Sequence, residues 1–359
     1  MVKYLYTAFF VCFRIRGFMR PFTGRAPRRI LCRVQKTLSV INLSAISKNI
    51  KFIRRRAGSA KFYAVVKADA YGHGAERVSL HIQPQVDGFC VALTEEGAAL
   101  RIAGVTKPVL VLTPLTSADD ALAAAFYNLS VTVNGSASAR LCAGLSCHIK
   151  VNTGMNRYGC NIGELPVVLS TLASVGARVD GVYSHLYCPA EAREREAQLA
   201  LFEEAERLVK AAYPRAVCHI SASGGTLLGG KFIKGAVRCG ISMYGYAPQG
   251  FSREGLSPAL KVYARRIQKT DVCGRGAGYM VATKNYVSLS AYRLGYADGF
   301  ARTVPLGEGN LCMDAFVSEE DGEFIEVLSD ADEYAARCGT ISYEVLCSVT
   351  RRSERVYIN

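Results

Sequence analysis

The chain has 359 residues, half of them apolar, with 33 glycines and a formal net charge of +14 at pH 7. This composition excludes a disordered or fibrous protein and is typical of a globular enzyme or binding protein, long enough for one large α/β unit and a smaller domain. The positive charge does not indicate a nucleic-acid partner, because no acidic residue occurs before Asp69 and much of the excess therefore lies in one basic N-terminal third.

The 13 cysteines are scattered singly, without a C-x-x-C pair or a Cys/His cluster at zinc spacing. Several of them, including Cys90, Cys147 and Cys218, lie inside apolar runs of strand length. We therefore expect reduced, mostly buried thiols in a cytoplasmic protein without a metal site, because a disulfide framework is unusual in a chain of this length.

Residues 1–36 differ from the rest of the chain. The apolar stretch Tyr4–Phe13 is followed by seven arginines before Val34. The stretch is too short to span a bilayer, and no small-residue cleavage site follows it directly. Three interpretations remain: an over-long start of the reading frame, a basic surface-binding arm, or a targeting segment. The first is favoured because the globular pattern begins only near Thr37.

From Thr37 onward, short apolar runs alternate with amphipathic segments. Leu38–Leu43 has the pattern of a strand, and the following helix is predicted to have Ser44 as its N-cap and isoleucines at 46, 50 and 53 on one face. Eight further apolar runs of strand length follow: Lys61–Lys67, Asp87–Leu93, Lys107–Leu115, Leu129–Val133, Cys147–Asn152, Val179–His185, Val217–Ser221 and Ala236–Ile241. Helical patterns between them include Thr94–Ala103, Ala118–Tyr127, Leu165–Ser174 and Glu191–Ala212.

Eight strands alternating with helices predict a (β/α)₈ barrel. A doubly wound sheet is disfavoured, because no G-x-G-x-x-G follows the first of these strands. After the Pro/Gly/Ser-rich segment Ala247–Pro258 the chain becomes rich in strands with little helix between them: Lys261–Val272, Tyr286–Tyr292, Glu323–Leu328 and Ser353–Ile358. The predicted organisation is an extension of residues 1–36, a barrel of residues 37–248 and a mostly β C-terminal domain of residues 249–359.

The functional residues of a parallel barrel lie at the carboxyl ends of its strands. Polar residues at these predicted ends are Lys67, Tyr71, Lys150, Asn152, Arg157, His185, Ser221, Ser223 and Arg238. Taken singly, each has a structural explanation: a lysine after a strand is more often a solvated charge than a nucleophile, and His185 could be a buried core histidine. Together with Gly224, Gly225 and Gly240 they supply the parts needed to hold a phosphorylated carbonyl cofactor.

From about Thr37 to the C-terminus the chain resembles the alanine racemases, pyridoxal-phosphate enzymes built from a barrel and a β domain. In the barrel the resemblance rests on A-V-V-K-A-D-A-Y-G-H-G (64–74), K-V-N-T-G-M-N-R-Y-G (150–159), S-H (184–185), S-A-S-G-G-T (221–226) and V-R-C-G-I-S-M-Y-G (237–245). In the second domain it rests on G-R-G-A-G-Y (274–279), L-G-Y-A-D-G (294–299), L-C-M-D (311–314) and I-S-Y-E-V (341–345).

The resemblance implies a racemase that interconverts L- and D-alanine with two catalytic bases, Lys67 and Tyr279, and supplies D-alanine for cell-wall peptidoglycan. Tyr279 would come from the partner subunit of a homodimer with shared active sites. The implied cofactor-binding residues are Lys67, Tyr71, His185, Ser223, Arg238, Gly240, Ile241 and Tyr343. Chemically, a cofactor bound through Lys67 stabilises negative charge at the amino-acid Cα, and the lysine amine can then act as a base.

By the same resemblance, Arg157 would face the substrate carboxylate and Met313 would reach the active site of the partner. Lys150 matches a position that is carbamylated in some relatives and would brace Arg157, while Tyr296 would narrow the entrance. Arg238 would face the pyridine nitrogen and keep it unprotonated, because a permanent cation cannot accept its proton. The resulting weaker electron sink favours racemisation over other reactions.

Other activities remain open at this stage. A broader racemase acting on serine, lysine or arginine shares the chemistry, and a fold-related decarboxylase shares the architecture but is expected to use an acidic residue in place of Arg238. A non-catalytic carrier of pyridoxal phosphate would need only the barrel, and the β domain bearing Tyr279 argues against it.

Three features depart from the family pattern. Asn152 replaces the usual acidic residue of V-D-T-G, and Ala222 stands where an Asn commonly precedes the phosphate-binding serine. The segment between Asp298 and Cys312 is shorter than is typical, which predicts a trimmed hairpin in the β domain.

Overall fold

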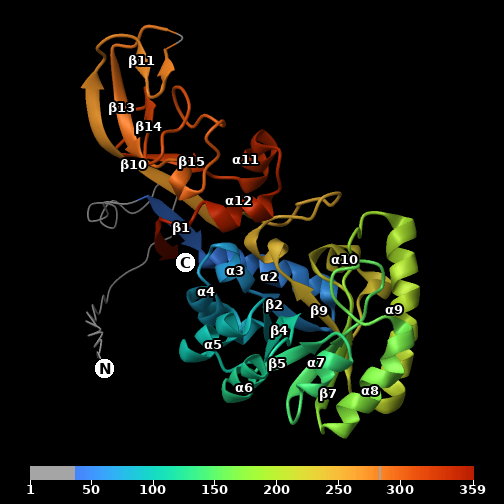
Figure 1. The fold of residues 1–359 in the computed structure, drawn as a ribbon. Coiled ribbons are helices and arrows are strands. Elements are labelled where there is room, and N and C mark those ends of the chain that lie inside the picture. Colours follow the sequence, from blue (N-terminus) through green and yellow to red (C-terminus); the bar gives the residue numbers. More distant parts are fainter. Residues whose placement is uncertain (1–36, 283) are drawn as a thin grey trace, which may run out of the picture. The chain divides into compact units, whose positions relative to one another are not determined.

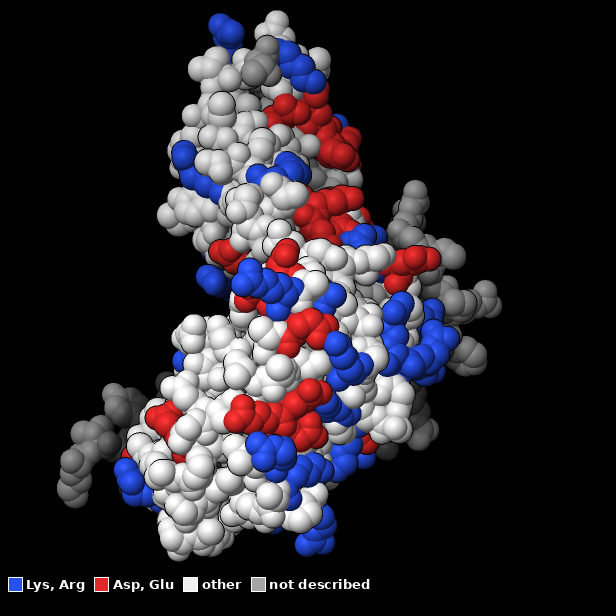
Figure 2. All heavy atoms as spheres, turned by 90° about the vertical axis from the view of Figure 1, so that its right-hand side faces the viewer, with Lys and Arg blue, Asp and Glu red and all other residues white. Residues whose placement is uncertain are grey.

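The computed structural model describes residues 37–282 and 284–359 (Figure 1). The extension predicted for residues 1–36 lies outside the described residues. Nine of the 44 Lys and Arg residues and none of the 30 Asp and Glu residues lie in that extension, so residues 37–359 carry a formal charge of +5. On the face drawn in Figure 2, acidic and basic side chains lie beside one another over much of the surface.

Eight parallel strands form a nearly closed barrel, as predicted from their alternation with helices. They run in the order β8-β7-β6-β5-β4-β3-β2-β9, and the ring closes just beyond the end of β8, where the Arg238 N–H of β9 donates to the Ser221 carbonyl at 2.9 Å. Their bounds are β2 Lys61–Val65, β3 Gly88–Val91, β4 Val109–Pro114, β5 Ser130–Val133, β6 Ser146–Lys150, β7 Arg178–Tyr183, β8 Val217–His219 and β9 Ala236–Cys239. These strands are buried on both faces, so their sequences read as continuous apolar runs.

Helices surround the barrel strands (Figure 1). They are α2 Leu43–Ala57, α3 Lys67–Tyr71, α4 Ala75–Ile82, α5 Thr94–Ile102, α6 Ala118–Phe126, α7 Ser136–Arg140, α8 Leu165–Ser174, α9 Ala192–Ala212 and α10 Ser223–Leu228. The four helices predicted with bounds match α5, α6, α8 and α9 to within one residue at each end. Cys90, Cys147 and Cys218 are buried free thiols on β3, β6 and β8, as predicted.

The start of α2 corrects one prediction. The N-cap is Asn42 rather than Ser44, because the Asn42 side chain accepts the Ala45 N–H at 2.8 Å and the helix begins at Leu43. Ser44 therefore lies inside the first turn. The predicted buried face is confirmed, since the isoleucines at 46, 50 and 53 are all fully buried.

A second sheet contains most of the C-terminal strands and the first strand of the described chain. The main strand order is β14-β13-β10-β1-β16, and β15 also pairs with β10. The strands are β1 Leu38–Asn42, β10 Leu260–Asp271, β13 Ser288–Arg293, β14 Phe316–Ser318, β15 Phe324–Leu328 and β16 Glu354–Ile358. β1 lies antiparallel to β10 and parallel to β16, so residues within the range predicted for the barrel pair with this sheet.

Shorter elements complete the C-terminal region. β11 Gly276–Ala277 and β12 Met280–Val281 form a two-stranded ribbon, and α11 Ala331–Cys338 and α12 Ser342–Ser348 are helices that the sequence analysis did not predict. Residues 299–312 contain turns and one isolated bridge, Glu308 to Val317, where a trimmed hairpin was expected. Within the described ranges, every helix is too short or too polar to cross a lipid bilayer.

Candidate functional site

Lys67 follows β2 directly and begins an unusual turn. The four residues after it, Ala68, Asp69, Ala70 and Tyr71, all have φ between 51° and 55°. Left-handed backbone costs an L-residue about 1–2 kcal/mol, because Cβ approaches the following carbonyl oxygen. A run of four such residues without a glycine is therefore strained, and the contacts around it must hold it in place.

Two carboxylates hold this turn. Glu96 of α5 accepts the Ala68 N–H at 2.7 Å, and it also accepts two N–H groups at the start of its own helix. The Asp69 carboxylate accepts the Ala75 N–H at 2.7 Å and pairs with the Arg355 guanidinium at 2.6 Å. The sequence analysis missed Glu96, and no capping-box signal points to it, because the residue at the N-cap three positions earlier is Leu93, whose side chain cannot accept a hydrogen bond.

Two glycines let C-terminal residues pack against the turn. At Gly72, a Cβ would lie 2.3 Å from the Leu346 carbonyl oxygen of α12. At Gly74, a Cβ would lie 1.9 Å from the Tyr357 hydroxyl of β16. Both glycines also have positive φ. Glycine is therefore required at positions 72 and 74, which end the 64–74 motif, by close packing as well as by backbone conformation.

The surroundings of Lys67 make its ammonium form less stable. Burial lowers the pKa of Lys67, and the Arg157 guanidinium lowers it further, while the Glu96 carboxylate opposes the shift. Lys150, at the end of β6, is buried, and burial followed by the positive charges of Arg238 and Arg157 lowers its pKa well below the usual range. Both lysines are thereby biased toward neutral, nucleophilic amines.

Arg238 is buried inside the barrel, where backbone carbonyls accept hydrogen bonds from its guanidinium. Its Nη2 donates to the Ser184 carbonyl at 2.6 Å, its Nη1 donates to the His219 carbonyl at 2.9 Å, and its guanidinium lies 4.9 Å from the centre of the Tyr183 ring. Burial, followed by the Arg238 charge, lowers the pKa of the neighbouring His185 well below its usual range. His185 is therefore a neutral imidazole next to a fixed cation.

A cradle of neutral donors lies at the start of α10. The Ser223 hydroxyl accepts the N–H groups of Gly240 and Ser242, at 3.3 and 3.4 Å. A Cβ at Gly240 would lie 2.5 Å from the Tyr71 hydroxyl, so this glycine lets the phenol reach the same place. The Ser242 hydroxyl is buried without a hydrogen-bond partner. Hydroxyls and N–H groups gathered in this way fit a phosphate group, and the unpartnered hydroxyl is an additional donor for it.

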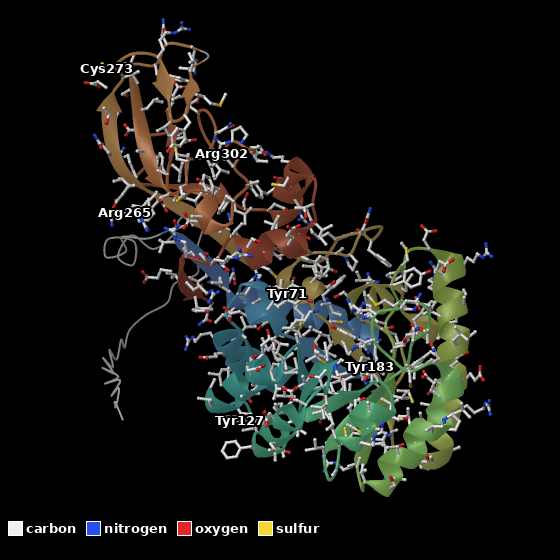
Figure 3. All side chains as sticks on the ribbon, viewed as in Figure 1. Tyr71, Tyr127, Tyr183, Arg265, Cys273 and Arg302 are labelled. Atoms are coloured by element: carbon white, nitrogen blue, oxygen red, sulfur yellow. The ribbon has the colours of Figure 1, made fainter. Side chains whose placement is uncertain are left out.

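Aromatic packing fixes one wall of this cradle. The Tyr71 ring lies 5.0 Å from Tyr244 and 6.0 Å from Tyr343, and Tyr244 donates to the Val65 carbonyl at 3.0 Å. Figure 3 labels Tyr71 in the α3 region and Tyr183 among the barrel strands. Ile241, which begins a short 3₁₀ helix over Ile241–Tyr244, is buried beside Ser242. The structure thus brings together five of the residues implied to bind the cofactor: Tyr71, Ser223, Gly240, Ile241 and Tyr343.

The departure at Asn152 has a local explanation. The Asn152 side-chain oxygen accepts the N–H groups of Gly154 and Asn156, each at 3.1 Å, in the loop after β6. A carboxylate would accept the same bonds, so an amide oxygen is sufficient to fold this loop. Arg157 is exposed on the same loop, beside the Tyr158 ring.

Three predicted site residues are exposed in the C-terminal region. Tyr279 lies between β11 and β12 and is 75 % exposed, Met313 is 52 % exposed, and Tyr296 is 37 % exposed. The segments of Tyr296 and Met313 are neighbours, because the N–H groups of Tyr296 and Ala297 donate to the carbonyls of Cys312 and Met313. Among the described residues, no hydrogen bond, ion pair or ring contact joins Tyr279 to the barrel residues above.

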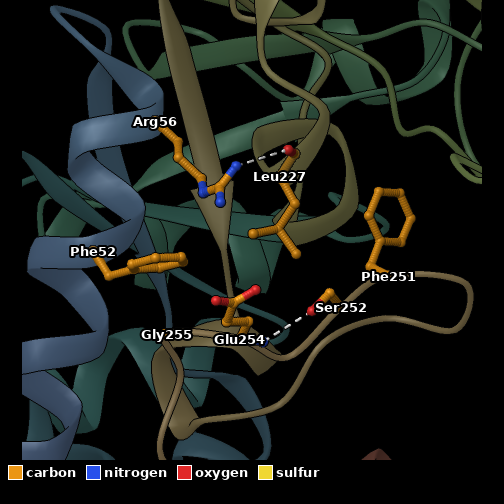
Figure 4. A pocket seen from close by; sticks show the side chains of 7 residues that line it. All are labelled: Phe52, Arg56, Leu227, Phe251, Ser252, Glu254 and Gly255. Atoms are coloured by element: carbon orange, nitrogen blue, oxygen red, sulfur yellow. Dashed lines mark hydrogen bonds between the residues drawn. The ribbon is translucent and has the colours of Figure 1, made fainter.

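Two cavities lie apart from the candidate site residues described above. One, of about 430 Å³, has Phe52 of α2 and Phe251 on opposite sides, and the Arg56 guanidinium donates to the Leu227 carbonyl at its edge (Figure 4). The other, of about 640 Å³, opens at the amino ends of the barrel strands. Within residues 37–282 and 284–359, no cluster of His, Cys, Asp or Glu is arranged to hold a metal ion.

A family model described as the N-terminal domain of alanine racemase matches residues 41–248. Alanine racemases from Streptococcus equi subsp. zooepidemicus and Streptococcus uberis are each 33 % identical to this chain, over 89 % and 90 % of it and 98 % of their own length. The match therefore extends through both the barrel and the C-terminal region.

Solved structures of alanine racemases also match the fold of this chain. Alanine racemase from Bacillus anthracis with bound L-Ala-P has a TM-score of 0.82 at 27 % identity, covering 91 % of this chain and 96 % of its own. The biosynthetic alanine racemase from Pseudomonas aeruginosa has a TM-score of 0.79 at 27 % identity, covering 91 % and 100 %. Alanine racemase from Bartonella henselae with covalently bound pyridoxal phosphate shares the fold, with a TM-score of 0.75 at 24 % identity.

Proposed function

Because the chain belongs to the alanine racemase family, we propose that it interconverts L-alanine and D-alanine with pyridoxal phosphate, using Lys67 and Tyr279 as the two bases. One observation carries the proposal: the strained turn that begins at Lys67 lies against the cradle of hydroxyl and N–H groups formed by Tyr71, Ser223 and Gly240. A broad-spectrum racemase or a decarboxylase is not favoured, since the relatives reported above are alanine racemases.

Lys67 binds the cofactor covalently and exchanges a proton with the substrate Cα on one face. Pyridoxal phosphate, when bound, stabilises negative charge at that carbon. The lowered pKa of Lys67 suits both tasks, because only the neutral amine can attack a carbonyl or accept a proton. Glu96 and Asp69 keep the turn in its left-handed conformation and so fix the direction of the lysine.

The phosphate is held by Tyr71, Ser223 and Tyr343 and by backbone N–H groups near Gly240 and Ile241. All are neutral donors, so the phosphate keeps its negative charge and is bound by directed hydrogen bonds. The Tyr71 phenol stays protonated and donates, because burial raises its pKa.

Arg238 would face the ring nitrogen of the cofactor and would keep it unprotonated, because a buried permanent cation disfavours a second positive charge. His185, whose lowered pKa favours the neutral imidazole, would lie beside the cofactor ring. An acidic residue in place of Arg238 would favour a protonated ring and a stronger electron sink, so Arg238 favours reversible proton exchange.

Arg157 binds the substrate carboxylate, and Lys150 braces it. The pKa of Lys150 lies well below its usual range, which favours the neutral amine that carbamylation by CO₂ requires. A carbamate on Lys150 would place a negative charge among Arg157 and Arg238 and would compensate their mutual repulsion.

The second base, Tyr279, comes from the partner subunit of a homodimer, together with Met313 and the entrance residue Tyr296. The exposed side chains of Met280 and Val281, which directly follow Tyr279 in β12, support this arrangement, because adjoining exposed apolar residues indicate an interface. The enzyme acts in the cytoplasm and supplies D-alanine for peptidoglycan.

Lys67→Ala should abolish both the cofactor's visible absorbance at the lysine linkage and alanine racemisation, and retention of either would refute the assignment. Tyr279→Phe should slow the exchange of the Cα hydrogen with solvent for one alanine enantiomer more than for the other.

Mixing the Lys67→Ala and Tyr279→Phe variants, each of which lacks one of the two bases that racemisation needs, tests the shared site. A mixed dimer holds both substitutions in one site and none in the other, so random mixing should restore about a quarter of wild-type activity. No recovery after confirmed subunit exchange would show that both bases come from one chain.

A further inference from the structure

A line of buried polar side chains crosses the interior of the barrel. It begins at Arg238 on β9, whose Nη1 lies 2.6 Å from His219 Nδ1, and continues from His219 Nε2 to His148 Nδ1 on β6 at 2.8 Å. All three residues are buried. The proposed reaction uses Arg238 directly and assigns no part to His148.

The hydrogen bonds determine where the protons lie. Arginine has only donors, so His219 Nδ1 must accept and be unprotonated. A neutral His219 then carries its proton on Nε2 and donates it to His148 Nδ1, which leaves the His148 proton on Nε2. Both imidazoles are neutral, because burial lowers the pKa of His148 to about 4 and lowers that of His219 well below its usual range.

Packing around the His219 and His148 rings holds the two imidazoles in this orientation. The Tyr183 ring stacks on His219, with centroids 5.0 Å apart and an interplanar angle of 4°, and the Tyr183 hydroxyl is hydrogen-bonded to Thr132 Oγ1 at 2.8 Å. A Cβ at Gly181 would lie 2.4 Å from His148 Nδ1, so glycine is needed there for His148 to reach His219. The Tyr63 ring makes T-shaped contacts with both imidazoles.

His148 also lines the 640 Å³ cavity at the amino ends of the strands, where Lys61, Ser130 and Val217 begin β2, β5 and β8. Its Nδ1 faces His219, so the Nε2–H is the atom left to face this cavity. The line therefore runs from the centre of the proposed active site to the opposite end of the barrel.

We propose that His148 is a positioning residue for the racemase reaction: by accepting from His219 it fixes the imidazole that anchors the Arg238 guanidinium. This rests on the proposed function, in which Arg238 faces the ring nitrogen of the cofactor. Without the acceptor, the His219 Nε2–H would be buried and unpaired, and rotation of the imidazole to find another acceptor would remove Nδ1 from Arg238.

Asparagine and leucine at position 148 form a matched pair, because they have nearly the same shape and only asparagine offers an acceptor at the position of Nδ1. His148→Leu in the holoenzyme should lower kcat about tenfold, as expected for one buried unpaired donor, with the KM for alanine changed less than about twofold. His148→Asn should restore kcat to within about threefold of wild type. Equal losses in both variants, or no loss in either, would overturn the proposal.

A second measurement needs no variant and no catalysis. In ¹⁵N-histidine-labelled wild-type protein, a scalar coupling through the hydrogen bond should join His219 Nε2 to His148 Nδ1, with His219 Nδ1 unprotonated. A His219 protonated on Nδ1, or no coupling, would overturn the proposal even if His148→Leu fails to fold. If the wild type does not racemise alanine, the proposed function fails, whereas this coupling still reports on the line of imidazoles.

Discussion

Ala68→Gly should stabilise the protein, although alanine to glycine is normally a destabilising change. Ala68 is exposed, with φ of 51° and ψ of 50°, and its N–H bond to Glu96 does not depend on its side chain. Left-handed backbone costs alanine about 1–2 kcal/mol and costs glycine almost nothing. Glycine loses about 0.5–1 kcal/mol more on folding, because its unfolded chain is freer, so the expected net gain is about 0.5–1 kcal/mol.

The matched control is Ala200→Gly, at an exposed position in the middle of α9. There glycine should lower the free energy of unfolding by about 1 kcal/mol. The chemical change is the same at both sites, so the effect on the unfolded chain cancels in the comparison. The two variants should therefore differ by about 1.5–2 kcal/mol, with opposite signs.

Urea unfolding followed by circular dichroism measures both values at one pH and cofactor concentration. If Ala68→Gly destabilises the protein as much as Ala200→Gly, the turn after Lys67 carries no left-handed strain, and the argument that surrounding contacts hold the lysine in place fails.

Two further predictions concern buried groups. Lowering the pH from about 7.5 to about 5 should lower the free energy of unfolding by about 2 kcal/mol for each of His73 and His148. Burial lowers the pKa of each imidazole to about 4 in the folded protein, whereas in the unfolded chain the pKa is about 6.5. The stabilisation is therefore present above pH 6.5 and is lost as the pH falls toward 4. Urea titrations at the two pH values check this, and equal midpoints would contradict it. Gly74→Ala should destabilise the protein by about 1–3 kcal/mol, because the new Cβ would meet the Tyr357 hydroxyl. Gly144→Ala, where φ is also positive and no atom lies within 4 Å of the new Cβ, is the control and should lower thermal stability less; equal losses would be inconsistent with this packing.

The barrel could be predicted from the sequence because its strands are short, mostly apolar runs that alternate with helical patterns, and several of them carry a polar residue at or near the carboxyl end. Burial on both faces favours the apolar runs, and the carboxyl ends of barrel strands are where functional residues lie. Lys67, Lys150 and Arg238 could be selected by these rules, and the structure brings Lys150 and Arg238 into the same buried interior. Their catalytic roles stay predictions, since geometry alone does not test them.

The turn after Lys67 could not be predicted, because nothing in Ala68-Asp69-Ala70 favours left-handed backbone. The conformation is imposed by residues distant in sequence, with Glu96 on one side and Arg355 on the other. The pairing of β1 with β16 likewise joins Leu38 to Glu354, and local pattern carries no information on such a contact.

Helix α11 was missed although its signals were present. Asp330 caps its start by accepting the Asp332 N–H, and Gly339 ends it with positive φ. The strands on either side led to a β interpretation of the whole region.

The C-terminal region supports the candidate site within its own chain. Arg355 pairs with Asp69 and donates to the Gly72 carbonyl at 3.0 Å, and Leu346 packs where Gly72 has no side chain. These contacts are all made to the turn that begins at Lys67. A barrel alone would leave this strained turn with Glu96 as its main support, which is a physical reason why a carrier of the cofactor built from the barrel alone is a poor alternative.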